Sequence, residues 1–392
     1  MAIIFHIQSG GHLRIVILVL SITISIFAQI RISNQLFVYP QSLNIDSYNS
    51  IGFSNLNLST ASDISSANPA SLYQFENISF GLNYTYISSL KLFDGITLSS
   101  SKEIPPITFA FIYPLNNFRI GLAYHQKYNN YLELGEMEIT TIENPEGTGE
   151  YFNATSESII HSPSLLFDYT IKNVFTDDKL SMGLQLFWDF LKIEEKIYKT
   201  KGKLEGNNFS WKLGVLYEYD KKIYISCVYE KENKLEGKIE IDDTLTVLDI
   251  DVGSGQLLEF NPQYFLKLPD KLAFGITVKP MDKLSLSTSV SSVFWEGVND
   301  RYRNNLDLSI STIYKLNESI MISLGFYNTN LNSSTSDYYY ESLDYNSSFI
   351  GLGINWQVKN FDIQCEFLDN KLFASKISKQ TQVKIGIDFT YN

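Results

Sequence analysis

The sequence predicts an all-β protein, a 14-stranded antiparallel transmembrane β-barrel with an N-terminal plug, or hatch, segment. Three observations lead to this fold class. Stretches of alternating apolar and polar residues recur from about residue 78 to the end of the chain, the connections between them alternate between short and long, and the composition is rich in aromatic residues. This combination is typical of single-chain outer-membrane barrels, whose strands alternate between lipid and lumen.

The last stretch, from Gln382 to Tyr391, shows the alternation most cleanly. In an extended strand, successive side chains point to opposite faces. One face of this strand carries Val383, Ile385, Ile387, Phe389 and Tyr391, and the other carries Lys384, Gly386, Asp388 and Thr390. A soluble sandwich could bury such an apolar face, but a terminal aromatic strand equally suits the closing strand of an outer-membrane barrel. For a barrel we expect the barrel-assembly machinery to be a partner through this strand, and Lys384→Ala to cost little stability.

The composition limits the function. There are 25 Tyr and 26 Phe among 392 residues, which suits the aromatic girdles of a membrane barrel. The formal net charge is −12, and no basic stripe is visible, so no nucleic acid is expected as a partner. The outer-membrane lipid bilayer is the expected surrounding.

The N-terminus predicts export. Arg14 is followed by mostly apolar residues from Ile15 to Phe27 and then by Ala28, which indicates a signal peptide over residues 1–28. Residues 29–77 show no lasting strand period, and they read either as a plug (hatch) or as a disordered leader. Residues 78–392 are expected to form the barrel, and no transmembrane helix is expected.

The strand pattern sets the topology. Short connections are expected at residues 114–117, 173–178, 220–221, 280–282, 316–317 and 359–360, and longer ones between them, the largest being 129–158. The stretch from Asn261 to Lys279 contains Pro262 and Pro269, and reading it as one kinked strand keeps the strand count even. Candidate strands lie near 78–88, 105–114, 117–128, 159–173, 178–198, 206–219, 221–240, 260–279, 283–295, 304–315, 317–328, 344–358, 360–370 and 378–391. A soluble sandwich or propeller is the alternative, but the spacing is too irregular for blades.

No residue pattern predicts catalysis. His125 and His161 have no nucleophile elbow or triad-like spacing near them, so no catalytic residue and no enzyme are expected. Cys227 and Cys365 fall on apolar faces and read as small hydrophobic residues, and no cluster has metal-ligand spacing, so neither metal nor cofactor is expected. The mixed charges from Glu230 to Lys234 are expected to be solvated.

Two stretches carry a family resemblance. The first runs from Leu268 to Ser287, with Pro269, Gly275 and Pro280, and is followed by Trp295. The second ends in Asn68-Pro69-Ala70, directly before the first candidate strand. Together they resemble the hairpin and the plug of the FadL/TodX family of outer-membrane transporters. The resemblance implies a barrel closed by an N-terminal hatch that admits hydrophobic molecules, either long-chain fatty acids or hydrocarbons.

The chain departs from the family pattern in two places. Its plug has Asn55, Asn57 and Ser59 where the family is rich in Gly and Ala, and Ser71 where the family has Gly after Asn-Pro-Ala. No kinked third strand is recognisable at 117–128. A second hypothesis is a barrel similar to the PorV and PorQ type of the type IX secretion system, which docks exported proteins. Both hypotheses place the protein in the bacterial outer membrane.

Overall fold

The computed structural model describes residues 43, 45–47, 52–93, 96–103, 106–138, 149, 151–197, 200–242, 263–298, 303–329, 347–373 and 379–391. The predicted signal peptide, residues 1–28, lies outside this part of the chain, as does most of the predicted plug before residue 52. Within the described ranges no helix is long and apolar enough to cross a membrane.

The strands form a closed 14-strand antiparallel barrel, which confirms the predicted barrel. The last strand pairs with the first, from Ile78 opposite Tyr391 to Ile87 opposite Gln382, so the sheet has no free edge there. The barrel strands are β1 (Ile78–Ile87), β4 (Ile107–Leu115), β5 (Phe118–Glu138), β6 (Tyr151–Lys172), β7 (Asp178–Ile197), β8 (Thr200–Tyr219), β9 (Ile223–Lys231), β12 (Asp270–Met281), β13 (Leu284–Phe294), β14 (Asn305–Lys315), β15 (Ile320–Thr329), β16 (Ser347–Val358), β17 (Phe361–Asp369) and β18 (Thr381–Tyr391).

Four short strands extend the wall beyond the barrel. They are β2 (Leu90–Phe93), β3 (Ile96–Ser99), β10 (Leu235–Asp242) and β11 (Gln263–Leu266). The predicted strand 221–240 is therefore divided into β9 and β10, and the predicted kinked strand 260–279 into β11 and β12. In the second case β12 pairs with β9 and β13, whereas β11 pairs with β10. Pro269 lies at the break, where its missing N–H cannot continue a ladder.

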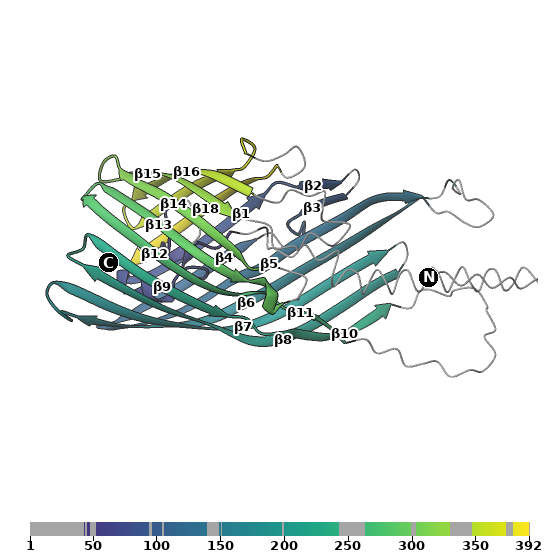
Figure 1. Cartoon of the computed structure of the whole chain (residues 1–392), viewed down its shortest axis with the longest axis horizontal. Helices are drawn as coiled ribbons and strands as arrows, with labels where there is room; N and C mark the ends of the chain where they lie inside the picture. Colours follow the sequence, from purple (N-terminus) through teal and green to yellow (C-terminus); the bar gives the residue numbers. More distant parts are fainter. Residues whose placement is uncertain are drawn as a thin grey trace, which may run out of the picture.

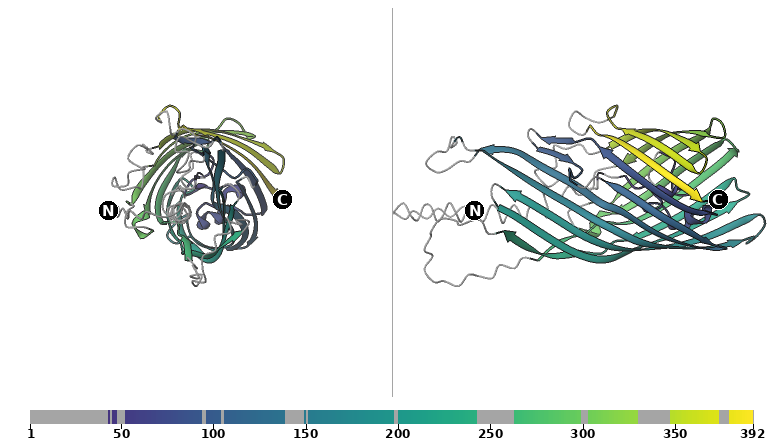
Figure 2. Two further views of the ribbon diagram at one scale, coloured as in Figure 1. Left: turned by 90° about the vertical axis from the view of Figure 1, so that its right-hand side faces the viewer. Right: turned by 180° about the vertical axis from the view of Figure 1, so that it is seen from behind.

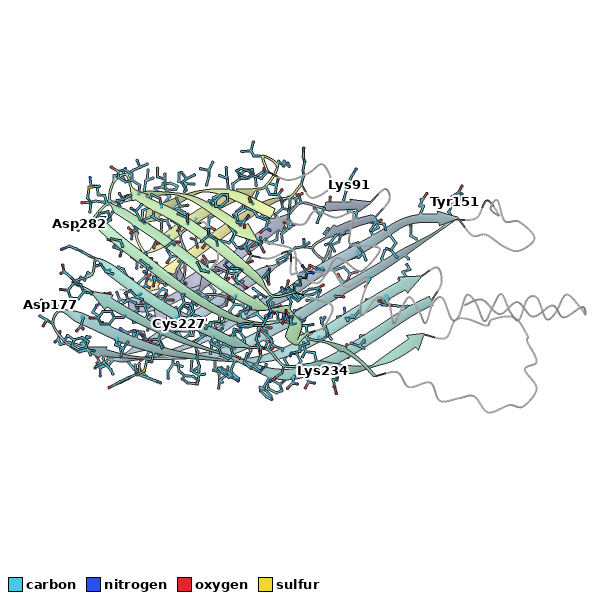
Figure 3. All side chains as sticks on the ribbon, in the orientation of Figure 1. Lys91, Tyr151, Asp177, Cys227, Lys234 and Asp282 are labelled. Atoms are coloured by element: carbon cyan, nitrogen blue, oxygen red, sulfur yellow. The ribbon has the colours of Figure 1, made fainter. Side chains whose placement is uncertain are left out.

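All six predicted short turns are present at one rim of the barrel. Asn116, Asn173, Asp177, Asp220, Lys221 and Lys359 have positive φ there. Asp220 and Lys221 are the central residues of the turn that the Lys222 amide closes on the Tyr219 carbonyl at 3.0 Å, and a type I′ turn needs positive φ at both positions. Figure 3 shows Asp177 and Asp282 at this rim, with Lys91 and Tyr151 far from it at the opposite end of the barrel.

The opposite rim differs from the prediction on one side. Strands β5 to β8 contain 21, 22, 20 and 20 residues, about twice the number needed to cross a membrane. Most of the predicted long connection 129–158 is therefore strand, and β7 passes into β8 across only residues 198–199. In the sequence these extensions have the polar composition of a connecting loop, because a strand outside the membrane needs no apolar outer face. Figure 1 shows β5 to β8 and β10 projecting past the other strands.

The third barrel strand, β5, is irregular, which the sequence did not indicate. Its pairing with β6 shifts register between Gln126 and Tyr128 and again between Glu133 and Glu136. Pro163 of β6 lies opposite Tyr124, just before the first shift. A bulge of this kind bends a strand and turns its side chains, and it leaves no signature in an alternation of residue types.

The outward face of the barrel is an apolar band. Its exposed members include Leu122, Leu186, Ile276, Leu324 and Ile385. Aromatic stacks lie on the same face, among them Trp188 with Phe190 and with Phe209, at ring-centroid distances of 5.4 and 5.3 Å. In water so large a continuous apolar surface would be an aggregation hazard, whereas in lipid it is the required surface.

Candidate functional site: the layered lumen

Residues 52–77, which we call the inner segment, lie inside the barrel. The segment contains two short 3-10 helices, η3 (Ala61–Asp63) and η4 (Pro69–Gln74). Leu56, Ile64 and Leu72 are fully buried. The end-on view in Figure 2 shows this part of the chain, in purple, enclosed by the ring of strands.

Hydrogen bonds tie the inner segment to strands all around the barrel. On one side the Ser62 carbonyl accepts from Asn83 of β1 and Thr108 of β4, at 3.1 and 2.7 Å. On the other side Asn57 donates to Thr277 of β12 at 2.9 Å. Further bonds reach β5 (Arg119 to the Phe75 carbonyl), β7 (Ser181 to the Ala70 carbonyl, Gln185 to the Ser65 carbonyl), β8 (Tyr73 to Glu218), β13 (Asn55 to Ser287) and β17 (the Phe53 amide to Glu366).

Glycines in the wall allow the inner segment to come this close. A Cβ added at Gly183 of β7 would lie 2.3 Å from the Ala70 nitrogen, and one at Gly81 of β1 would lie 2.0 Å from the Ser62 nitrogen. At Gly275 of β12 the first neighbour would be Leu56, at 2.8 Å. Real side chains cannot approach backbone atoms so closely, so these positions require glycine while the segment is in place.

The Asn68-Pro69-Ala70 turn starts the second inner helix. Asn68 is extended, with φ −70° and ψ 119°, as expected for a residue that precedes proline. Its side-chain oxygen accepts from the Ala70 amide at 3.0 Å, and its amide group donates to the Leu56 carbonyl at 3.0 Å. Pro69 occupies the first helical position, where no N–H is needed.

A buried ion-pair network anchors the middle of the inner segment. The Lys384 ammonium of β18 lies 3.0 Å from an Asp63 oxygen and 2.7 Å from Glu366 of β17. Burial by itself would raise the pKa of Asp63, but Lys384, together with hydrogen bonds from Ser54 and Thr60, lowers it below its ordinary value. The expectation that Lys384→Ala costs little assumed a solvated polar face. The inner segment occupies the polar face of β18 instead, so a larger cost is now expected.

Farther from the short-turn rim than the inner segment lies a group of buried charges that we call the charged layer: Lys127, Asp189, Lys212, Glu230 and Glu232. The Lys127 ammonium lies 2.7 Å from Glu232, 3.3 Å from Asp189 and 3.7 Å from Glu230. Lys212 lies 3.2 Å from Glu230. The side chains in these pairs are at most 5% exposed.

Beyond the charged layer the inner face becomes apolar. This apolar layer consists of Tyr128, Ile160, Leu191, Ile193, Leu204, Leu235 and Leu266, with Leu268 packed against it. Its residues come from β5, β6, β7, β8, β10 and β11, which are the strands of the projecting wall.

Strand β7 shows the order of the three layers along the barrel. Ser181, Gly183 and Gln185 contact the inner segment. Asp189 belongs to the charged layer, and Leu191 and Ile193 belong to the apolar layer. A molecule that enters from the projecting wall therefore meets the apolar layer first, then the charged layer, then the inner segment.

The predicted site residues are not one site. Asn68, Pro69 and Ala70 are buried together in the inner segment. Gly275 contacts the same segment, whereas Trp295 lies beyond β13 in a short 3-10 helix and Pro280 near the short-turn rim. Sequence reasoning missed the charged layer, since Glu230 and Glu232 were expected to be solvated and are 3% and 4% exposed. A signal was available in the sequence. Val228 precedes Glu230 by two residues and Glu232 by four, so in an extended strand all three lie on the same face.

No family model and no curated protein sequence matches the chain. Its structure is similar to that of the toluene transporter TbuX of Ralstonia pickettii, with 12% identity, a TM-score of 0.64, and coverage of 91% of this chain and 100% of TbuX. The toluene transporter TodX of Pseudomonas putida is 14% identical, with a TM-score of 0.58 and coverage of 89% of this chain and 98% of TodX. A FadL homologue of Pseudomonas aeruginosa is 14% identical, with a TM-score of 0.55 and coverage of 90% of this chain and 99% of the homologue.

These comparisons define a class of fold, the transmembrane β-barrels. Within that class, the chain has the fold of the FadL-type barrels, as its sequence resemblance implied. The similar proteins are named as toluene transporters and a monoaromatic hydrocarbon channel.

Proposed function

We propose that this protein is a bacterial outer-membrane transporter that admits hydrophobic small molecules, with the inner segment as its hatch. The observation that carries the proposal is the arrangement of the lumen: an apolar layer at the projecting end, and a segment bonded to the surrounding wall at the other. Barrels this wide enclose open space unless something fills them. The inner segment occupies that space, and it is the largest described part of the predicted plug, residues 29–77.

The apolar layer supports a hydrophobic substrate. Leu191, Ile193, Leu204 and Leu235 are 2%, 6%, 4% and 3% exposed and face the interior of the projecting wall. These side chains pack against one another, so an apolar solute has to part them to enter. Once between them it gains about 25 cal/mol for each Å² of its own surface that leaves water. The toluene transporters of similar fold point to the same class, hydrocarbons or long-chain fatty acids. The bilayer and the barrel-assembly machinery, acting on β18, complete the proposed partners.

Deleting residues 44–70 tests the hatch. The truncated barrel should fold, because it retains every barrel strand and the pairing between β1 and β18 that closes the barrel. It should show a large steady conductance in planar bilayers. The full chain should show little conductance yet take up hydrophobic solutes. Heat-modifiable migration on a gel is the control for folding. A steady pore in the full chain, or a truncated barrel that stays closed, would refute the hatch.

The secretion-docking hypothesis has no observation among the described residues in its favour. The same preparations address it, since a closed barrel without uptake of any hydrophobic solute would leave docking as the better explanation.

A further inference from the structure

The charged layer lies on the proposed path of the substrate. It is held by Asp189 of β7, Lys212 of β8 and Glu230 of β9, with Lys127 reaching across from β5. On β7 it is one inward position before the apolar Leu191. A solute that leaves the apolar layer for the inner segment has to pass these charges, so their balance affects which solutes enter.

The Lys127 ammonium has no capacity left for a further anion. A lysine has three N–H donors. The Lys127 ammonium donates to Ser210 at 2.6 Å, to Glu232 at 2.7 Å and to Asp189 at 3.3 Å. The ring of Phe187 lies 3.8 Å away on another side. A carboxylate from outside would have to break one of these bonds.

The other cations of this region are likewise paired. Lys212 lies 3.2 Å from Glu230 and also donates to the Ser66 carbonyl of the inner segment. Lys271 of β12 forms an ion pair with Asp46. Within the charged layer the two ammonium groups of Lys127 and Lys212 face three carboxyl groups, those of Asp189, Glu230 and Glu232, so neither cation is left over for a further anion. An additional carboxylate here would be repelled, and it would lose its hydration without gaining a partner.

We infer that the charged layer is a charge filter that passes uncharged hydrophobic molecules and rejects carboxylates. Asp189, Glu230 and Glu232 are then the specificity-determining residues, and Lys127 is the cation they keep occupied. This inference rests on the proposed transport function, and within it the filter favours hydrocarbons and alcohols over ionised fatty acids.

The test compares two solutes of equal chain length, decanol and decanoate. Uptake of each radiolabelled solute is measured at neutral pH in cells that lack their own hydrophobic-solute barrels and express the full chain, with empty-vector uptake subtracted. The wild type should prefer decanol by about tenfold or more, since an unpaired charge is rejected far more strongly than an altered apolar contact. Glu232→Gln, which removes one acceptor charge from Lys127, should raise decanoate uptake and leave decanol uptake almost unchanged.

Two controls make the result decisive. Glu205→Gln changes an exposed carboxylate of the projecting wall and should leave the ratio unchanged. Asp189→Asn should act in the same direction as Glu232→Gln, which guards against one variant failing to fold. Equal uptake of both solutes by the wild type, or variants that change both equally, would overturn the filter while transport stands. Uptake of neither solute would refute the proposed function itself, and the filter with it.

Discussion

The two faces of the barrel wall are built on different rules. The outward face is uniform, with apolar side chains following one another along the described strands. The inward face changes every few residues, from contacts with the inner segment through the charged layer to the apolar layer. On the outward face only residue class matters, whereas on the inward face individual residues matter, because each is paired with a group far away in the sequence.

The largest expected effect on the inward face is that of Gly183→Val. The new side chain would overlap the backbone at Pro69 and Ala70, so the inner segment could not occupy its place. Valine is itself well suited to a strand, so the barrel should persist. We expect a steady open pore in planar bilayers with normal heat-modifiable migration.

The matched control is Gly202→Val in β8, where an added Cβ would meet nothing within 4 Å. This variant should conduct as little as the wild type. A closed Gly183→Val barrel would mean that the close approach of the inner segment is not needed to seal the lumen.

Lys384→Ala tests the inward face electrostatically. It leaves Asp63 and Glu366 buried without their cation, and breaking a buried pair in this way costs about 3–5 kcal/mol. Urea unfolding in lipid vesicles measures the loss. Lys222→Ala is the control, because its pair with Asp220 is exposed at the short-turn rim and its loss should leave the stability almost unchanged. Equal losses would contradict the buried anchor.

These differences explain how much could be predicted from sequence. The alternation of Ile385 and Ile387 with Lys384 follows from strand geometry and an apolar surrounding, so strand number and the outward face could be predicted. The partner of Lys384 is Asp63, more than three hundred residues earlier, and no local pattern carries that information. The projecting parts of β5 to β8 were missed because above the membrane their outward residues are polar and look like loop.

Ile385→Arg tests the adjacent residue on the opposite face. An arginine facing lipid near the midplane should cost about 2–4 kcal/mol, and Ile322→Arg of β15 should behave alike. Both side chains are exposed on the outward face. The measurement is again urea unfolding in vesicles, with Ile385→Val as the control that preserves residue class. No loss from either arginine would mean that this face is not in contact with lipid.

The smallest expected effect is that of Asn68→Ala. The Asn68 side chain caps the second inner helix through the Ala70 amide and also holds the Leu56 carbonyl, while β7, β8 and the other strands do not depend on it. Loss of such a cap costs about 1 kcal/mol, which corresponds to about a fivefold increase in the population of a displaced inner segment. Single-channel recordings should therefore show brief openings about five times as often, with the unfolding midpoint of the barrel unchanged. Asn68→Ser retains a capping oxygen and should open less often than Asn68→Ala. If the two variants open equally often, the capping bond does not help to hold the segment closed, and a lower unfolding midpoint would show that the turn supports the barrel itself.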